Sequence, residues 1–282
     1  MLENFIFENH LGQRFEGLAN GVYLNSNDLR DYRWRYDTMN SRISRFYRNT
    51  TDRKLPLTVI CKTDEEAIKV KNRLMEIAEV DIEAMMPGKI IVGDYYTKGY
   101  ITASVKSNYM IKKRYCKITL TLTSDDPVWY RESMYSFFSD GTAVSPDGGG
   151  GGSDASATDY PWDYKWDYAS PSTNQIVCDS VRDNAFILKI YGAITNPVVT
   201  IGGHSYVVNG VVKDGETLLI DSLTKTITLT RATGEKENWF DMRNRNSYIF
   251  KPIPPGQHFV VKNGSFGVDL TVIEKRSEPK WI

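Results

Sequence analysis

Hydrophobic and polar residues alternate along several segments of the first half of the chain, and this pattern predicts β-strands. The alternation is clearest at residues 116–123, where Ile118, Leu120 and Leu122 alternate with threonines. A period of two residues is typical of a strand with one buried face. Shorter segments predict further strands at residues 57–61, 89–92 and 100–105.

A different period follows the first of these strands and predicts one amphipathic helix over about residues 64–79. Thr63 precedes three acidic residues, and Glu66 lies three positions after it. This arrangement predicts a capping box, and acids in the first turn suit the helix dipole. Four apolar residues at helical spacing form one stripe: Ala67, Val70, Leu74 and Ile77. The helix is expected to lie on the sheet of an α+β domain that ends near residues 125–127.

The second half of the chain has no helical period and consists of short apolar segments between turn residues. About eight strands are expected there, at residues 186–190, 198–201, 206–208, 217–220, 226–230, 248–250, 258–261 and 268–273. Asn209-Gly210 and Asn263-Gly264 are expected to form hairpin turns, because both residue types tolerate positive φ. Regular short strands are typical of a β-sandwich or jelly roll. The expected fold class is mainly β, with an α+β first domain that has one helix and an all-β second domain.

A run of five glycines and an aromatic repeat divide the chain into two globular halves. The glycines are residues 148–152, and the repeat Asp-Tyr-Pro-Trp-Asp-Tyr-Lys-Trp-Asp-Tyr occupies residues 159–168. Glycine-rich segments behave as flexible linkers. The expected domains are residues 1–140 and 173–282, joined by a linker at residues 141–172.

The aromatic repeat has two candidate roles. Its acids are Asp159, Asp163 and Asp167, and carboxylates bind calcium, but their spacing differs from that of a calcium loop. Tyr and Trp combine a large apolar area with a polar tip. The favoured interpretation is an aromatic strap that holds the linker against a protein surface through Trp162, Tyr164 and Trp166.

Residues 30–54 form the most basic segment, with eight basic residues against three acidic ones. Aromatic and basic residues alternate at its start, as in a strand with one aromatic and one cationic face. Such a segment can bind single-stranded nucleic acid. The alternative is an extended arm that packs on a neighbouring subunit, and it is favoured because the rest of the chain has no basic excess. The arm candidates are Arg33, Trp34, Arg35, Tyr36, Arg42, Arg45 and Arg48, and the basic run continues to Arg53.

Composition argues against several partners. Lys and Arg together number 35, as do Asp and Glu, so the formal net charge is zero. A neutral chain gives no general electrostatic reason to bind nucleic acid or an anionic membrane. No apolar run approaches the ~20 residues that span a bilayer. The N-terminal segment lacks the basic region and apolar core of a signal peptide.

Motifs for catalysis and metal binding are missing from the sequence. Cys61, Cys116 and Cys178 are far apart and form no C-x-x-C, so reduced and mostly buried thiols are expected. The three histidines have no metal-ligand spacing, and no P-loop or nucleophile motif occurs. A glycosidase needs two paired carboxylates, and nothing in the sequence pairs them. The protein is therefore expected not to be an enzyme, and to bind neither a metal ion nor a cofactor.

Several motifs resemble those of the distal tail proteins (Dit) of long-tailed bacteriophages that infect Gram-positive hosts, and they occur in the same order along the chain. The sequence Asp-Pro-Val-Trp-Tyr at residues 126–130 is similar to the end of that family's first domain, and the repeat at residues 159–168 is similar to its Asp-Tyr-Pro-Tyr-Asp-Tyr segment. Further similar stretches are residues 192–197, 215–221, 254–256 and 276–281. The five glycines depart from the family pattern.

The resemblance implies a structural protein of the virion tail tip, synthesised in the cytoplasm of the bacterial host. It implies a homo-hexameric ring built by the first domain, which joins the tail tube protein to a tail-associated hub or lysin protein while DNA passes through the lumen. It implies a galectin-like or carbohydrate-module-like second domain that docks host-recognition components. The alternative function is a carbohydrate-binding module that contacts cell-wall sugars, with Trp239 and Tyr206 as the candidate contacts.

Overall fold

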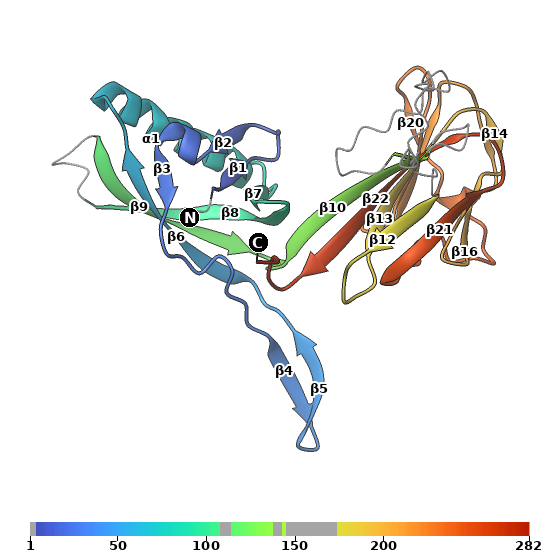
Figure 1. Ribbon diagram of the computed structural model, residues 1–282, viewed down its shortest axis with the longest axis horizontal. Coiled ribbons are helices and arrows are strands. Elements are labelled where there is room, and N and C mark those ends of the chain that lie inside the picture. The colour runs from blue at the N-terminus through green and yellow to red at the C-terminus, as the bar shows by residue number, and fades with distance from the viewer. Residues whose placement is uncertain (1–3, 108–113, 138–142, 145–173, 282) are drawn as a thin grey trace, which may run out of the picture. The chain divides into compact units, whose positions relative to one another are not determined.

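The computed structural model describes residues 4–107, 114–137, 143–144 and 174–281 (Figure 1). The chain divides into two compact units: unit 1 is Met1–Arg131 with Lys275–Ile282, and unit 2 is Glu132–Glu274. The sequence patterns place residues 132–137 in the first domain and residues 275–281 in the second, whereas the structure assigns residues 132–137 to unit 2 and residues 275–281 to unit 1. The reason is that strands β10 (Trp129–Phe137) and β22 (Gly267–Arg276) each have residues in both units.

Unit 1 consists of antiparallel strands and one α-helix among its described residues. Its strands are β1 (Ile6–Glu8), β2 (Arg14–Glu16), β3 (Val22–Leu24), β4 (Arg35–Met39), β5 (Arg42–Tyr47), β6 (Thr51–Ile60), β7 (Gly88–Val92), β8 (Tyr95–Ser107), β9 (Tyr115–Ser124) and the start of β10. A 3-10 turn, η1, covers Leu18–Asn20, and the helix α1 covers Asp64–Glu83.

Strand β8 belongs to two pairing series in unit 1. Its first half lies between β7 and β10, which continues a sheet of order β2-β1-β7-β8-β10. Its second half pairs with β9, which leads to β6 and β3. A register shift between Ile101 and Ala103 separates most of the second pairing from the first. Both series and α1 enclose one hydrophobic core, in which Phe7, Leu120 and Trp129 are fully buried.

The expected helix is present, and the predicted cap at Thr63 is confirmed, although Glu66 reaches back to Lys62 and not to Thr63 itself. The Glu66 N–H donates to Thr63 Oγ1 at 3.1 Å, and Glu66 Oε2 accepts from the Lys62 N–H at 2.9 Å. The predicted apolar stripe is buried. The helix runs four residues beyond the expected end at residue 79, because the buried stripe continues through Asp81, a polar residue that an apolar pattern omits.

Unit 2 is an antiparallel sandwich. Besides parts of β10 and β22, its strands are β11 (Ala143–Val144), β12 (Gln175–Cys178), β13 (Ala185–Tyr191), β14 (Ile194–Thr195), β15 (Val198–Ile201), β16 (His204–Val207), β17 (Val211–Val212), β18 (Thr217–Asp221), β19 (Thr226–Thr230), β20 (Lys236–Asn238) and β21 (Gly256–Lys262); a 3-10 turn, η2, covers Phe240–Met242. One sheet has the order β22-β13-β18-β19-β20, and the other has the order β12-β21-β15-β16. Alternate residues of both sheets, such as Leu188 and Val260, share one core. The mainly β fold class is confirmed.

Three local expectations for unit 2 are wrong. Residues 248–250 form no strand, although Ile249 and Phe250 are buried. Neither Asn209-Gly210 nor Asn263-Gly264 joins paired strands, and none of these four residues has positive φ. Gly210 instead allows close packing, because a Cβ built there would lie 2.7 Å from Cζ3 of Trp239.

Candidate functional site

The basic segment forms a two-stranded hairpin, hereafter the arm, made of β4 and β5. Among the described strands, each pairs only with the other, and Figure 1 shows the arm projecting from the rest of unit 1. Asn40 and Ser41 close it with φ of 51° and 60°. Two successive residues with positive φ form the type of turn whose twist matches paired strands. The alternation of aromatic and basic residues predicted a strand from residue 32. Strand β4 begins only at Arg35, so it starts later than predicted.

The arm carries exposed apolar side chains. Met39 is 69% and Ile43 is 53% exposed, and more than half of Tyr36 and Phe46 is exposed as well. The rings of Tyr36 and Phe46 meet edge to face with centroids 6.4 Å apart. An isolated two-stranded hairpin is marginally stable in water, and exposed apolar patches mark interaction sites. These properties are typical of an interaction surface.

Two arginines fix the base of the arm to the C-terminal segment of the same unit. The guanidinium of Arg48 lies 4.0 Å from the ring centroid of Trp34 and donates to Ser277 Oγ. The guanidinium of Arg30 lies 4.3 Å from the ring centroid of Trp281 and donates to the Pro279 carbonyl at 3.4 Å. Cation–π contacts of this kind stabilise by about 0.5–1 kcal/mol where they are exposed.

Arg53 is not part of the exposed arm, contrary to its place in the basic run. It lies in β6, is 2% exposed, and belongs to the sheet of unit 1. Its guanidinium donates to the carbonyls of Pro127 and Asp31 at 3.3 and 3.4 Å, and to Thr97 Oγ1 at 3.4 Å. Burial lowers the pKa of Arg53 from its ordinary value. Its role is to join the segment that leads into the arm to the body of unit 1.

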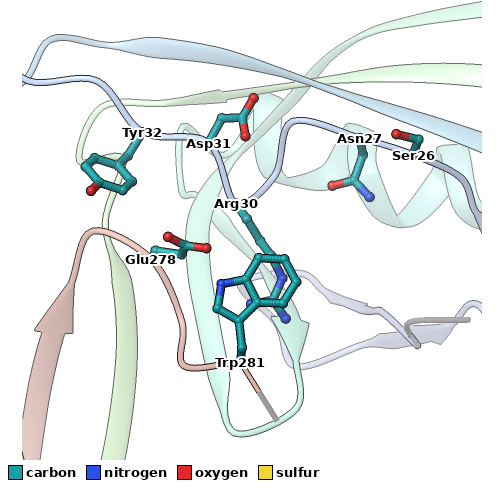
Figure 2. Close-up of a pocket in the computed structure, with 7 residues that line it drawn as sticks. All are labelled: Ser26, Asn27, Arg30, Asp31, Tyr32, Glu278 and Trp281. Atoms are coloured by element: carbon teal, nitrogen blue, oxygen red, sulfur yellow. The ribbon is translucent and has the colours of Figure 1, made fainter. Parts of the chain in front are cut away.

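A hollow of about 580 Å³, hereafter the base pocket, lies where the chain enters the arm (Figure 2). Figure 2 shows Arg30 beneath the ring of Trp281, with Glu278 beside them. The rings of Tyr32 and Trp281 are exposed, the latter by 75%. The pocket is lined by Ser26, Asn27, Arg30, Asp31, Tyr32, Glu278 and Trp281.

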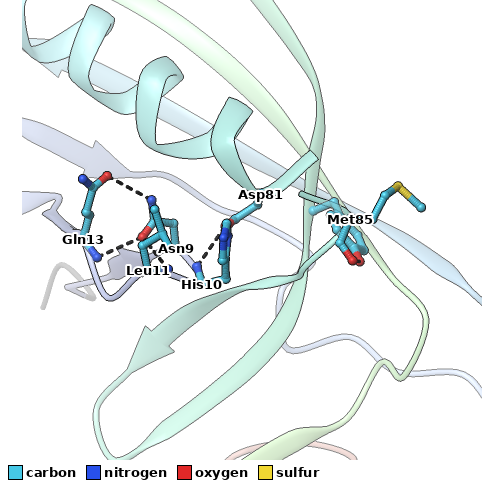
Figure 3. A network of polar contacts seen from close by, with 7 residues as sticks. Asn9, His10, Leu11, Gln13, Asp81 and Met85 are labelled. Atoms are coloured by element: carbon cyan, nitrogen blue, oxygen red, sulfur yellow. Dashed lines mark hydrogen bonds and ion pairs between the residues drawn. The ribbon is translucent and has the colours of Figure 1, made fainter. Parts of the chain in front are cut away.

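A polar network fixes the turn between β1 and β2 to the end of α1 (Figure 3). The fully buried Asp81 accepts from the His10 N–H at 2.9 Å, and its Oδ1 lies 2.7 Å from His10 Nδ1. Asn9 Oδ1 accepts from the N–H groups of Leu11 and Gln13 at 3.1 and 2.9 Å. These bonds join the turn to the helix through Asp81 Oδ1, whereas Asp81 Oδ2 is buried without a hydrogen-bond partner among the described residues.

The two candidate sugar contacts lie in the core of unit 2. Tyr206 is 2% exposed, and its hydroxyl donates to the Lys251 carbonyl at 2.7 Å. Burial also raises the pKa of Tyr206. Trp239 is 8% exposed, and its Nε1 donates to Glu237 Oε2 at 3.1 Å. Neither side chain presents a ring face to solvent, so neither provides a platform for a sugar.

Strand β21 carries an exposed aromatic residue that was not among the sugar contacts predicted from the sequence. Phe259 is 66% exposed, and Val261 on the same strand is also exposed. Phe259 stands opposite Gln175 of β12, whose Nε2 donates to Gln257 Oε1 at 3.2 Å. An uncharged surface with one ring and two amides can contact neutral polar molecules.

Some of the site residues that were predicted from the sequence lie outside the described residues. The strap residues Trp162, Tyr164 and Trp166 belong to this part, as do the three acids of the repeat. Within the described residues, no group of three or more His, Cys, Asp or Glu side chains is arranged to hold a metal ion. The three cysteines are free, and burial raises the pKa of Cys178 to about 11. No helix among the described residues is long and apolar enough to cross a membrane.

Comparison with known proteins gives matches among solved structures. No protein-family model and no curated protein matches the chain. The crystal structure of the Dit protein of phage SPP1, described as a hub of the adsorption apparatus in phages infecting Gram-positive bacteria, matches with a TM-score of 0.59 at 10% identity over 98% of this chain and 100% of that chain. A chain of the phage P2 baseplate in its activated conformation with Ca matches with a TM-score of 0.60 at 12% identity over 99% of this chain and 100% of that chain.

The chain has the fold of a phage distal tail protein. The likeness spans both units, so the order of motifs along the sequence indicated the correct architecture. The base pocket was missed, because residues 26–32 and residues 278–281 are distant in sequence and Trp281 carries no local signal for a contact with Arg30.

Proposed function

We propose that this chain is a structural protein of a phage tail tip, and that copies of unit 1 form a hexameric ring. The observation that carries the proposal is the arm: it pairs with no other described strand and exposes four large apolar side chains. Because an arm of this kind gains stability only against another surface, a neighbouring copy in a ring is its natural partner. The full-length likeness to a hub protein of phage SPP1 supports the same role.

The proposed ring has partners on each side and is not an enzyme. The tail tube protein lies above it, a tail-associated hub or lysin protein lies below it, and DNA passes through its lumen. Unit 2 docks a host-recognition component. Trp162, Tyr164 and Trp166 hold the linker to a protein surface. The protein acts at the virion tail tip after synthesis in the cytoplasm of the bacterial host.

Mass photometry and negative-stain electron microscopy of the purified full chain test the ring. We expect a species of six times the 32.1 kDa chain mass, seen as a ring with six-fold symmetry. Replacing Tyr36 and Phe46 by Ser removes the exposed rings of the arm and should reduce this species. Tyr248→Ser, a matched loss of an exposed ring in unit 2, should not. A chain that stays monomeric at every concentration, with the arm intact, overturns the proposal.

A carbohydrate-binding role for unit 2 is a second candidate function, and Phe259 is the observation that favours it. Its exposed ring lies beside the paired amides of Gln175 and Gln257. Aromatic rings beside neutral hydrogen-bonding groups suit sugars, which have apolar faces and hydroxyl edges. The full chain should be retained on purified Gram-positive cell walls, and Phe259→Ala should lose retention while Tyr248→Ala keeps it. No retention of the wild-type chain excludes this role.

A further inference from the structure

We propose that the arm tip of one copy binds the base pocket of the next copy, with Arg42 facing Glu278. The arm tip is the hollowed surface lined by Met39, Asn40, Arg42, Ile43 and Ser44. This inference rests on the proposed ring and names the two surfaces that join its subunits.

The arm tip is apolar and basic. Met39 and Ile43 are both more than half exposed, and Arg42 stands opposite Met39 in the register of the hairpin. Arg45, two positions before Tyr47 on the same strand, adds a second positive charge to β5. A docking partner for this tip therefore needs apolar area together with negative charge.

The base pocket has both properties. Tyr32 and Trp281 supply exposed aromatic rings, and aromatic residues are enriched at protein interfaces. Two acids line the pocket, Asp31 and Glu278, against one base, Arg30. The guanidinium of Arg30 is covered by Trp281 and donates to the Pro279 carbonyl, and Figure 2 shows Glu278 beside this pair, so Glu278 is the acid that would meet an incoming cation. Complementary charge of this kind fixes the register of two surfaces.

The geometry requires that the tip and the pocket belong to different copies. Tyr32 of the pocket lies three residues before β4 begins, so the pocket is at the base of its own arm. A strand rises about 3.3 Å per residue, which places the far end of the five-residue strand roughly 17 Å from that base. The tip cannot return to its own pocket while β4 and β5 keep their pairing.

Two different surfaces at opposite ends of one element give a head-to-tail contact. Head-to-tail contacts form closed rings when the rotation between copies closes, whereas a symmetric dimer would use the same surface twice. The arm tip and the base pocket thus favour a ring over a two-fold dimer.

Charge reversal in two separate chains tests the contact. Arg42→Glu places like charges across the contact, and so does Glu278→Arg; each alone should weaken self-association about tenfold or more. An equimolar mixture of the two variants should restore assembly in rings where the variants alternate. At one kind of contact the new carboxylate at position 42 faces the new guanidinium at position 278, and at the other kind the native Arg42 faces the native Glu278. Only a contact between copies is restored by mixing.

A matched pair of charge reversals on unit 2 serves as the control. Lys236→Glu and Glu235→Arg repeat the two charge changes at exposed positions outside the proposed contact. Each should leave assembly unchanged, alone and in the mixture.

The outcomes separate the contact from the ring. Assembly of both single variants at the wild-type level overturns the arm-to-pocket contact and leaves the ring intact, with another protein as the occupant of the pocket. Loss of assembly without rescue in the mixture also overturns the contact. A wild-type chain that never assembles overturns the ring and the contact together. Rescue in the mixture, in the absence of any other tail protein, supports both.

Discussion

At the scale of single residues, burial rather than residue type decides what each basic side chain does. Arg42 and Arg53 belong to the same basic run, yet Arg42 is exposed on the arm while Arg53 is 2% exposed inside unit 1. The sequence presents both as cations in a polar stretch. Only the pairing of β6 with β9 places Arg53 among the carbonyls of Asp31 and Pro127.

Truncation of Arg53 provides the test at this scale. Arg53→Ala leaves two carbonyls and the Thr97 hydroxyl without a donor and opens a cavity. Hydrogen bonds to charged groups contribute about 1.5–3 kcal/mol, so the free energy of unfolding should fall by about 3 kcal/mol. Urea unfolding of the wild type and the variant measures this change. Arg35→Ala, an exposed arginine of the arm, should change it by less than about 0.5 kcal/mol. Equal stability of the two variants would mean that Arg53 anchors nothing.

At the scale of elements, the features that depend on neighbouring residues were predicted well, and the features that depend on long-range packing were not. The start of α1 was found because a capping box and an apolar stripe lie within fifteen residues of one another. Its end was missed because Asp81 is buried through His10, which lies 71 positions away. Alternation likewise located most strands of unit 2, since a period of two is a local property.

Alternation cannot tell which side of a strand faces the core, and this explains the aromatic residues of unit 2. Tyr206 and Phe259 both lie in alternating segments, but Tyr206 faces the sandwich core and Phe259 faces solvent. Both strands belong to one sheet, and the registers of β16 with β15 and of β15 with β21 decide the faces. Tyr206 stands opposite the buried Val199, whereas Phe259 is the neighbour of the buried Val260 and therefore points to the other face. The prediction for Asn209-Gly210 failed for a related reason, because Gly210 packs against the ring of Trp239, which is distant in sequence.

At the scale of the whole molecule, folding and the proposed assembly depend on different parts of unit 1. The core of unit 1 contains no residue of β4 or β5, whereas the exposed apolar area of the arm has no role in that core. A chain in which residues 36–46 are replaced by a short Gly-Ser turn should therefore fold as the wild type does. It keeps Trp34 and Arg48, so the contacts at the base of the arm remain.

This arm-deleted chain should remain monomeric at concentrations where the wild type forms the proposed ring, since it lacks the tip that we propose meets the neighbouring copy. Circular dichroism should retain the β spectrum, and the thermal midpoint of the dilute, monomeric proteins should agree to within a few degrees. Light scattering then compares assembly of the two chains. Unfolding of the deleted chain would show that the arm belongs to the fold of unit 1. A deleted chain that still forms the ring would move the subunit contact from the arm to another surface, and the exposed apolar side chains of β4 and β5 would then serve a different tail protein.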